Sequence, residues 1–236
     1  MKPTIIEITR HGIKANDPKT GKSLDQLSEE GIHEALKRGE ERYHGEKDII
    51  MYHSPLKRTG ETVWSYNLGA GGGGVYKGAD QRLGLDSLSP VAKKLGLDGE
   101  DKAFSRKIMN ASPGIDKKVA GEGISFIQDA YNKHKKDTNP HVVAVSHDVK
   151  TPMIYGQLVG RTDYDAFRPR ELDRLVVKID NDEHGKPTGA QVNYQERGWE
   201  KVDLGKLLGS GAQHLKAHND NTEQPSVSYA AEKKAA

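Results

Sequence analysis

Short apolar segments rich in β-branched residues alternate along this chain of 236 residues with segments of helical periodicity. Residues 4–9, 48–53 and 141–146 have the length and composition of buried strands. Two later segments, residues 175–179 and 190–195, are joined by a short polar connection typical of a hairpin. Because strands that alternate with helices form mainly parallel sheets, the pattern predicts an α/β fold. We expect a three-layer sandwich, with helices on both faces of a mainly parallel sheet that has an antiparallel edge strand.

Local signals place the expected helices. Ser28 can cap a helix whose first turn holds two glutamates, which are favourable near the positive end of a helix. Ser54 is expected to cap the next helix, with Pro55 at its first position. A further helix is expected from residue 151. An insert at about residues 75–139 is expected to be mostly helical. Its expected helices are residues 89–95, 101–109 and 123–136.

The composition indicates one domain followed by a tail. A hydrophobic fraction of 34% is enough for one sizeable core, which we place within residues 1–208. Residues 209–236 are rich in Ser, Ala, Lys and Gln and have almost no periodicity, so we expect them to be disordered.

The charge balance and the missing cysteines exclude several classes of function. The 36 basic and 34 acidic side chains give a formal charge of +2, which provides no general attraction for nucleic acid or an anionic membrane. With no cysteine, the chain has no disulfides, thiolate nucleophile or Cys-ligated zinc, which fits a reducing cytoplasm. No signal segment and no membrane span are expected. We expect a cytoplasmic protein that acts on a small molecule; the sequence leaves its oligomeric state open.

Each of the three expected parallel strands ends in residues that bind anions or transfer protons. The first ends at Arg10-His11-Gly12, the second runs into a segment that contains Arg58, and the third ends at His147-Asp148. In an open α/β sheet, the carboxyl ends of neighbouring strands border one crevice. If these strands are neighbours, two histidines and two arginines meet at one place.

This set of side chains suits phosphate chemistry. Arginine is permanently charged, and its planar guanidinium matches two phosphate oxygens at once. A neutral imidazole can attack phosphorus and later leave. A carboxylic acid must then protonate the leaving alkoxide and afterwards activate water. Fixed cationic side chains can neutralise the phosphoryl charge, so we expect neither a metal nor another cofactor.

The motifs, taken in order, closely resemble the signature segments of the histidine phosphatase superfamily, which includes phosphoglycerate mutases and histidine acid phosphatases. The resemblance covers residues 4 to about 160 and continues to the last expected strand, near residue 195. The matching segments are Arg10-His11-Gly12, Leu27-Ser28-Glu29-Glu30-Gly31, Ser54-Pro55-Leu56-Lys57-Arg58-Thr59 with Glu61-Thr62, and Ser146-His147.

The resemblance implies a role for each matching residue. His11 is implied to be the phosphorylated nucleophile, with Arg10, Arg58 and His147 completing the phosphate pocket. Two more residues are candidate phosphate ligands. Asn16 lies near where many members place a further ligand, and Lys14 falls where the acid-phosphatase branch has an arginine.

The proton donor has two candidates. His147-Asp148 resembles the His-Asp motif of the acid-phosphatase branch, in which the aspartate is the proton donor. The mutase-like branch instead uses a glutamate on the loop after the second helix. Here that loop has no glutamate at the expected place, and its nearest carboxylate is Asp86. We favour Asp148 over Asp86.

The function predicted from these residues is a metal-independent phosphatase that hydrolyses phosphomonoesters through a phosphohistidine on His11. A phosphoglycerate mutase-like phosphomutase and a non-catalytic phosphate-binding protein are the alternatives. In the structural alternative for the second motif, Arg58 simply pairs with Glu61 along its helix.

Other polar residues are expected to have ordinary surface roles. Lys150 and Arg168 are expected to be solvated, although Lys150 is close to the His-Asp motif. The same interpretation is given to seven histidines: His33, His44, His134, His141, His184, His214 and His218.

Overall fold

The computed structural model describes residues 2–97, 103–138 and 140–209. The expected tail therefore lies outside the described residues from residue 210 onward, as do His214 and His218. Among the described residues, no helix combines the length and the apolar character needed to cross a membrane.

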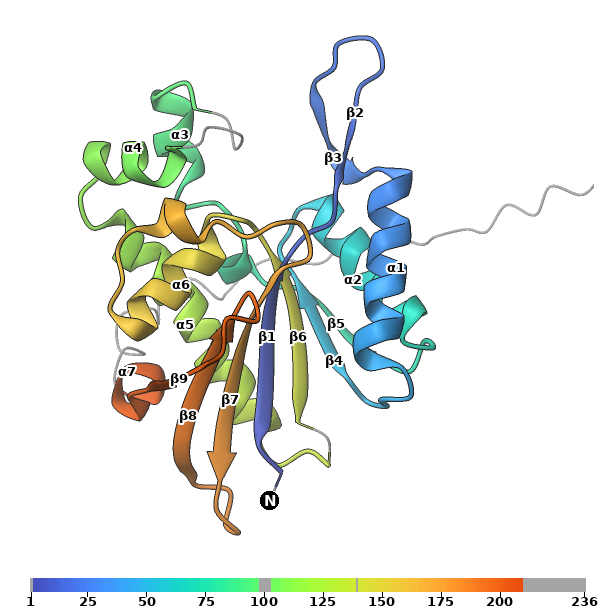
Figure 1. Ribbon diagram of the computed structural model, residues 1–236, viewed down its shortest axis with the longest axis vertical. Helices are drawn as coiled ribbons and strands as arrows, with labels where there is room; N and C mark the ends of the chain where they lie inside the picture. Colours follow the sequence, from blue (N-terminus) through green and yellow to red (C-terminus); the bar gives the residue numbers. More distant parts are fainter. Residues whose placement is uncertain (1, 98–102, 139, 210–236) are drawn as a thin grey trace, which may run out of the picture.

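A seven-stranded mixed sheet forms the centre of the domain, and its strand order is β5-β4-β6-β1-β7-β8-β9 (Figure 1). The four strands from β5 to β1 are parallel, and the last three are antiparallel to their neighbours. The expected α/β fold with a largely parallel sheet is confirmed. The strands are β1 (Thr4–Arg10), β4 (Ile50–His53), β5 (Val75–Ala79), β6 (His141–Ser146), β7 (Arg174–Asn181), β8 (Pro187–Tyr194) and β9 (Trp199–Val202).

Helices cover both faces of the sheet (Figure 1). Helices α1 (Glu29–Tyr43) and α2 (Lys57–Gly69) pack on one face, and α5 (Ile115–His134) and α6 (Lys150–Val159) pack on the other. The remaining helical elements are η1 (Gln81–Leu83), α3 (Ser89–Lys94), α4 (Phe104–Ala111), η2 (Tyr164–Phe167) and α7 (Leu204–Leu208).

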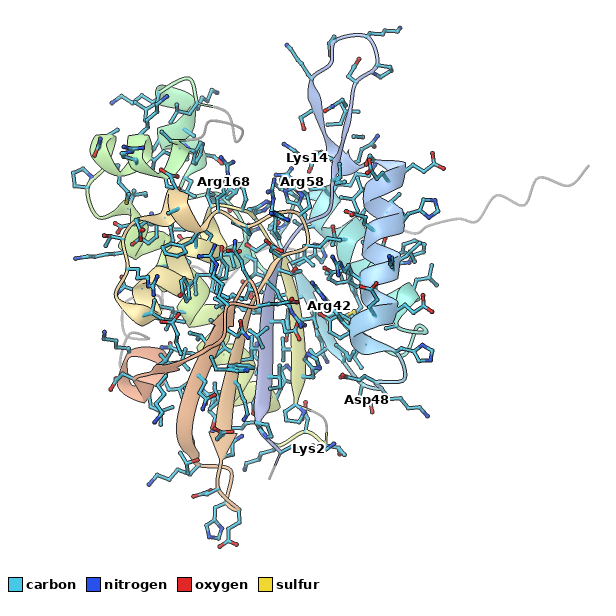
Figure 2. The ribbon with its side chains drawn as sticks, viewed as in Figure 1. Lys2, Lys14, Arg42, Asp48, Arg58 and Arg168 are labelled. Atoms are coloured by element: carbon cyan, nitrogen blue, oxygen red, sulfur yellow. The ribbon has the colours of Figure 1, made fainter. Side chains whose placement is uncertain are left out.

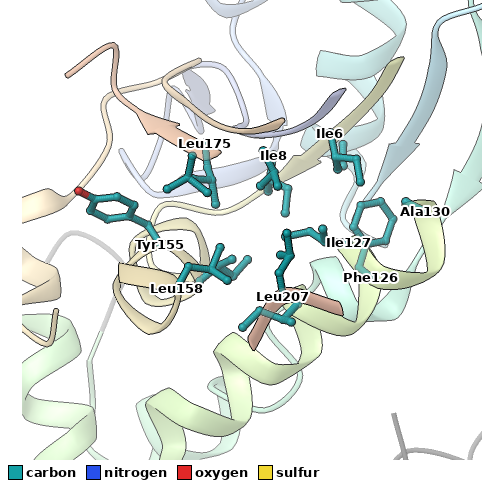
Figure 3. Packing of buried hydrophobic residues seen from close by; sticks show 14 of the residues in the cluster. Ile6, Ile8, Phe126, Ile127, Ala130, Tyr155, Leu158, Leu175 and Leu207 are labelled. Carbon is teal, nitrogen blue, oxygen red and sulfur yellow. The ribbon is translucent and has the colours of Figure 1, made fainter. Parts of the chain in front are cut away.

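Alternation along the central strands divides the core between these two layers. Ile6 and Ile8 of β1 point to the α5 and α6 side, where they meet Ile127 and Leu158 (Figure 3). Within β6, alternate residues join the two core clusters, so that Val143 lies with the α1 and α2 side chains. Because both of their faces are buried, these strands are nearly continuous apolar runs in the sequence, which is why their length and composition predicted them.

Several elements differ from the sequence prediction. The antiparallel edge consists of three strands, because β9 extends the expected hairpin. Strand β5 occupies residues expected to be helical, and its side chains are largely exposed at the sheet edge. A separate hairpin of β2 (Lys14–Asn16) and β3 (Ser23–Leu27) projects from one end of the molecule (Figure 1). All of these strands are short or lie at an edge, so they lack the apolar alternation that identifies a buried strand.

The expected helix starts were only partly correct. Ser28 caps α1 as predicted, with its hydroxyl accepting from the Gly31 N–H at 3.0 Å. Ser54 does not cap α2, which instead begins at Lys57 without a side-chain cap. Helix α5 begins at Ile115 rather than at residue 123, and the extra turns add Val119 to a buried cluster.

His141 was expected at the solvated surface, and this prediction is wrong. The ring is buried and bridges Glu46 and the buried Glu7 of β1, at 2.8 and 3.0 Å. Burial would raise the pKa of Glu7, but the hydrogen bonds and charges of His141 and Arg174 outweigh it and lower that pKa to about 2. His134 is also buried, beside Tyr52 and Asp137.

Two glycines let α1 and α2 approach closely. A Cβ atom on Gly39 of α1 would lie 2.3 Å from the carbonyl oxygen of Tyr66 on α2. A Cβ on Gly69 of α2 would lie 2.0 Å from the carbonyl oxygen of Leu36. Each of these distances is far below van der Waals contact with a backbone atom, which cannot rotate away. The spacing between the two helices therefore depends on these glycines, and α2 carries Arg58 at its start.

We predict that Gly39→Ala lowers the free energy of unfolding by about 1–3 kcal/mol, because the added methyl group forces α1 and α2 apart. Urea denaturation followed by circular dichroism measures the change. Gly121→Ala in α5 is the matched control, since a Cβ there has no neighbour within 4 Å. It should be neutral or slightly stabilising. Equal stability of the two variants would contradict this account.

Candidate active site

The carboxyl ends of β1, β4 and β6 lie side by side, because these three strands are consecutive in the sheet. The residues after them are therefore brought together, as the sequence predicted. Figure 2 shows Lys14, Arg58 and Arg168 at this same end of the sheet. The β2–β3 hairpin and helices α3 and α4 lie at that end too, on opposite sides (Figure 1).

The turn after β1 holds His11 in one orientation. The His11 N–H donates to the carbonyl of Ser146 on β6 at 3.2 Å, so the pairing of the two strands continues into the turn. The Gly12 N–H donates to Thr62 Oγ1 on α2 at 3.1 Å. A Cβ at Gly12 would lie 3.1 Å from the carbonyl oxygen of Gly31. The turn thus packs tightly between β6 and both helices on that face of the sheet.

The His11 ring is buried, with 4% of the residue exposed, and among the described residues only its Nδ1 has a hydrogen-bond partner. Nδ1 donates to the Gly12 carbonyl at 2.8 Å, so the lone pair of the neutral ring lies on Nε2. Burial, opposed by that hydrogen bond and aided by the charges of Arg58 and Arg10, lowers the pKa of His11 to about 4. At neutral pH the ring is therefore uncharged and nucleophilic.

His147 lies beside His11, with 5.5 Å between the ring centroids. Its Nε2 is 2.8 Å from Ser54 Oγ, and its Nδ1 is 3.4 Å from Arg58 Nη2. Burial, with the nearby charge of Arg58, holds the pKa of His147 well below its usual range. Ser54, expected as a helix cap, instead holds this ring in place.

Arg10 and Arg58 approach the two histidines with part of their hydrogen-bonding capacity unused. Arg10 donates to the Pro169 carbonyl at 2.7 Å and pairs with Glu171 at 2.9 Å. Arg58 pairs with Asp25 of β3 at 2.7 Å. The buried Nε atoms of both guanidiniums have no hydrogen-bond partner among the described residues. Such groups are costly unless a ligand binds them.

The interpretation of Arg58 as a helical partner of Glu61 is wrong. Glu61 instead pairs with Lys57 at 3.5 Å and accepts from the Leu27 N–H at 2.6 Å. Asp25 and Glu171 were missed by the sequence analysis. Asp25 stands two residues before Leu27-Ser28, a segment that the sequence analysis had matched. This closeness to a matched motif is the signal that could have identified it.

The two candidate proton donors occupy different environments. Asp148 lines the pocket, and Arg168 donates to its Oδ2 through Nε at 3.0 Å and Nη2 at 2.6 Å. Arg10 Nη2 lies 3.9 Å from the same oxygen. Asp86 is exposed and is not among the residues that line the pocket. Arg168, expected at the solvated surface, is therefore a partner of the site.

The other expected ligands and surface residues are placed as follows. Lys14 lines the pocket, whereas Asn16 is exposed on β2 and does not line it. Lys150 is fully buried rather than solvated, and its ammonium pairs with Glu122 at 2.8 Å. Among the described residues, no cluster of three or more His, Asp or Glu side chains could hold a metal ion.

These side chains open into one pocket of about 200 Å3. It is lined by Arg10, His11, Lys14, Arg58, Leu85, Leu88, Ser89, Ala92, Leu97, Phe104, Asp148 and Val149. The site thus combines a buried neutral imidazole, two guanidiniums and a carboxylate in one cavity. Such a set can bind a dianion, attack it and exchange a proton with it.

The fold has many solved counterparts, although no family model and no curated protein matches the chain by sequence. Mycobacterial glucosyl-3-phosphoglycerate phosphatase superimposes with a TM-score of 0.54 at 14% identity, over 84% of this chain and 100% of that one. A structure described as mycobacterial hydrolase 2 gives a TM-score of 0.55 at 16% identity, over 85% of this chain and 90% of that one. The fold is thus the one that the motif resemblance implied, since the mycobacterial phosphatase is a member of the histidine phosphatase superfamily.

We predict that His11 titrates near pH 4 and that Arg58→Gln moves this midpoint upward. Loss of the guanidinium removes a charge that disfavours the imidazolium, so the pKa of His11 rises toward the ordinary value of 6.5. Histidine side-chain NMR spectra, recorded as the pH is lowered, give both midpoints. A midpoint near 6.5 in the unmodified protein would contradict the proposed burial of a neutral ring.

Proposed function

We propose that this protein is a metal-independent phosphatase that hydrolyses phosphomonoesters through a phosphohistidine intermediate on His11. The observation that carries the proposal is the environment of the His11 ring. It is neutral, its Nδ1 is tied to the Gly12 carbonyl, and its neighbours are two guanidiniums whose buried Nε atoms lack partners among the described residues. The shared fold supports the proposal, since a complex of the mycobacterial phosphatase with inorganic phosphate also matches, with a TM-score of 0.50 at 14% identity.

In the first step, Nε2 of His11 attacks phosphorus as the bond from phosphorus to the ester oxygen breaks. Arg10 and Arg58 bind the phosphoryl oxygens and neutralise their charge, which replaces the need for a metal. The dianion also favours protonation of His147, whose Nδ1 then donates to a phosphoryl oxygen in place of accepting from Arg58.

Asp148 supplies the proton that the leaving alcohol requires. Its Oδ2 is bound by Arg168, so the proton is carried by Oδ1. After the alcohol leaves, the carboxylate takes a proton from water, which attacks the phosphohistidine and releases inorganic phosphate. Lys14, on the pocket wall, adds a further positive charge for the substrate. Asn16, exposed on β2, reaches the substrate in this proposal only if the hairpin changes its position.

We propose that the enzyme acts in the cytoplasm on a small phosphorylated molecule. The cysteine-free sequence fits a reducing compartment, and a small pocket rather than an extended surface carries the reactive groups.

The protein is predicted to hydrolyse an aryl phosphate in the presence of a chelator, releasing inorganic phosphate. His11→Ala should lower kcat by roughly 1,000-fold or more, since it removes the nucleophile. His33→Ala, at an exposed position of α1, is the control and should keep full activity. Activity that disappears with the chelator, or that survives the His11 change, would contradict the mechanism.

The proton donor is tested by two aspartate variants. Asp148→Asn should lower kcat by about 10²–10⁴-fold, the usual contribution of general acid–base catalysis. Asp86→Asn should have little effect, because that side chain is exposed outside the pocket lining. Steady-state kinetics on an alkyl phosphate, whose leaving group needs a proton, gives the comparison. The reverse result would assign the role to Asp86.

A further inference from the structure

The pocket around His11 has two chemically different walls. The residues of the first are charged or titratable: Arg10, His11, Lys14, Arg58 and Asp148. The second wall is almost entirely apolar: Leu85, Leu88, Ala92, Leu97, Phe104 and Val149. Ser89 is the one polar side chain that lines the pocket on this second side within the described ranges, and its hydroxyl already donates to the Leu85 carbonyl at 2.9 Å.

Packed side chains support the apolar wall from behind. Leu88, Phe104 and Val149 are buried and belong to one cluster with Ile108 and Met153. Leu85, Ala92 and Leu97 pack against this cluster and are only partly buried. The wall is therefore a face of a small core formed by α3, α4, α5 and α6, which gives it a defined shape.

The charged wall binds the phosphoryl group and supplies the proton for the leaving alcohol. The rest of that alcohol therefore faces the apolar wall. A leaving group with several hydroxyls or a carboxylate would lose hydration there and find few hydrogen-bond partners among the described side chains of this wall. Lys93 and Lys94 of α3 are exposed and do not line the pocket, so neither offers a second anion a partner there. An apolar leaving group instead gains free energy from the surface that it buries.

We propose that this pocket selects phosphomonoesters of compact apolar alcohols, such as arylalkyl phosphates, over phosphates of polyols or hydroxy acids. The inference rests on the proposed phosphatase function. The volume of about 200 Å3 favours a compact leaving group, since pockets for drug-sized ligands occupy roughly 300–1,000 Å3.

The test compares kcat/KM for benzyl phosphate, glycerol 3-phosphate and 3-phosphoglycerate. All three are esters of primary alcohols, so their intrinsic reactivities are similar and binding decides the order. Benzyl phosphate should be preferred by about tenfold or more, the discrimination that even one methylene group gives in an apolar pocket. Hydrolysis of all three without this preference overturns the inference and leaves the phosphatase function intact. Hydrolysis of none overturns the proposed function, and the inference with it.

A charge placed on the apolar wall should weaken the preference. Leu85→Lys, at a partly exposed position, removes apolar surface and offers an ammonium to a substrate carboxylate. It should lower the ratio of kcat/KM for benzyl phosphate to that for 3-phosphoglycerate by about tenfold. Leu95→Lys, an exposed leucine outside the pocket lining, should leave the ratio unchanged.

Ala92→Lys repeats the test on α3, should Leu85→Lys fail to fold as judged by its melting temperature. A ratio that stays constant in the folded wall variants would show that the leaving group does not contact this wall. A ratio that falls equally in the Leu95 control would show a general charge effect. Either result would overturn the inference.

Discussion

Positive charge buried at one end of a parallel sheet is the constraint on which the site depends. Arg10 and Arg58 are largely removed from water, and each is balanced by a carboxylate from outside the central strands, Glu171 and Asp25. Desolvated guanidiniums without anions would strongly destabilise this end of the molecule. The carboxylates offset that penalty only in part, because both Nε atoms stay without hydrogen bonds among the described residues. A phosphoryl dianion supplies both the charge and the acceptors that the site lacks.

The same charges contribute to the state of the histidines. Burial is the main reason that His11 and His147 stay neutral, and the neighbouring guanidiniums further disfavour an imidazolium. A neutral His11 is the form that can attack phosphorus, and the Gly12 carbonyl determines which nitrogen is available to do so. One arrangement thus binds the anion and keeps the nucleophile unprotonated.

Strands and site residues could be predicted from the sequence where a motif of a few neighbouring residues identifies them. The central strands and their end residues were predictable, because a β-branched run followed by Arg10-His11-Gly12 or His147-Asp148 is visible within a few positions. The partners that complete the site were not. Asp25 reaches Arg58 only through a hairpin with no apolar alternation, and Arg168 reaches Asp148 from a loop that follows α6. The same reason explains why Lys150 and His141 were wrongly assigned to the surface, since the burial of Lys150 depends on Glu122 and that of His141 on Glu7.

The division of the pocket into two walls follows from the order of elements along the chain. The charged wall comes mostly from the turns after the central strands, where the geometry of the sheet fixes the positions of Arg10, His11 and Asp148. Most of the apolar wall comes from the region between β5 and α5, which has a small core of its own. Changes in that core can reshape the space for the leaving group without disturbing the pairing of β1 with β6. Phosphoryl chemistry and substrate choice therefore rest largely on different segments of the chain, which meet at one pocket.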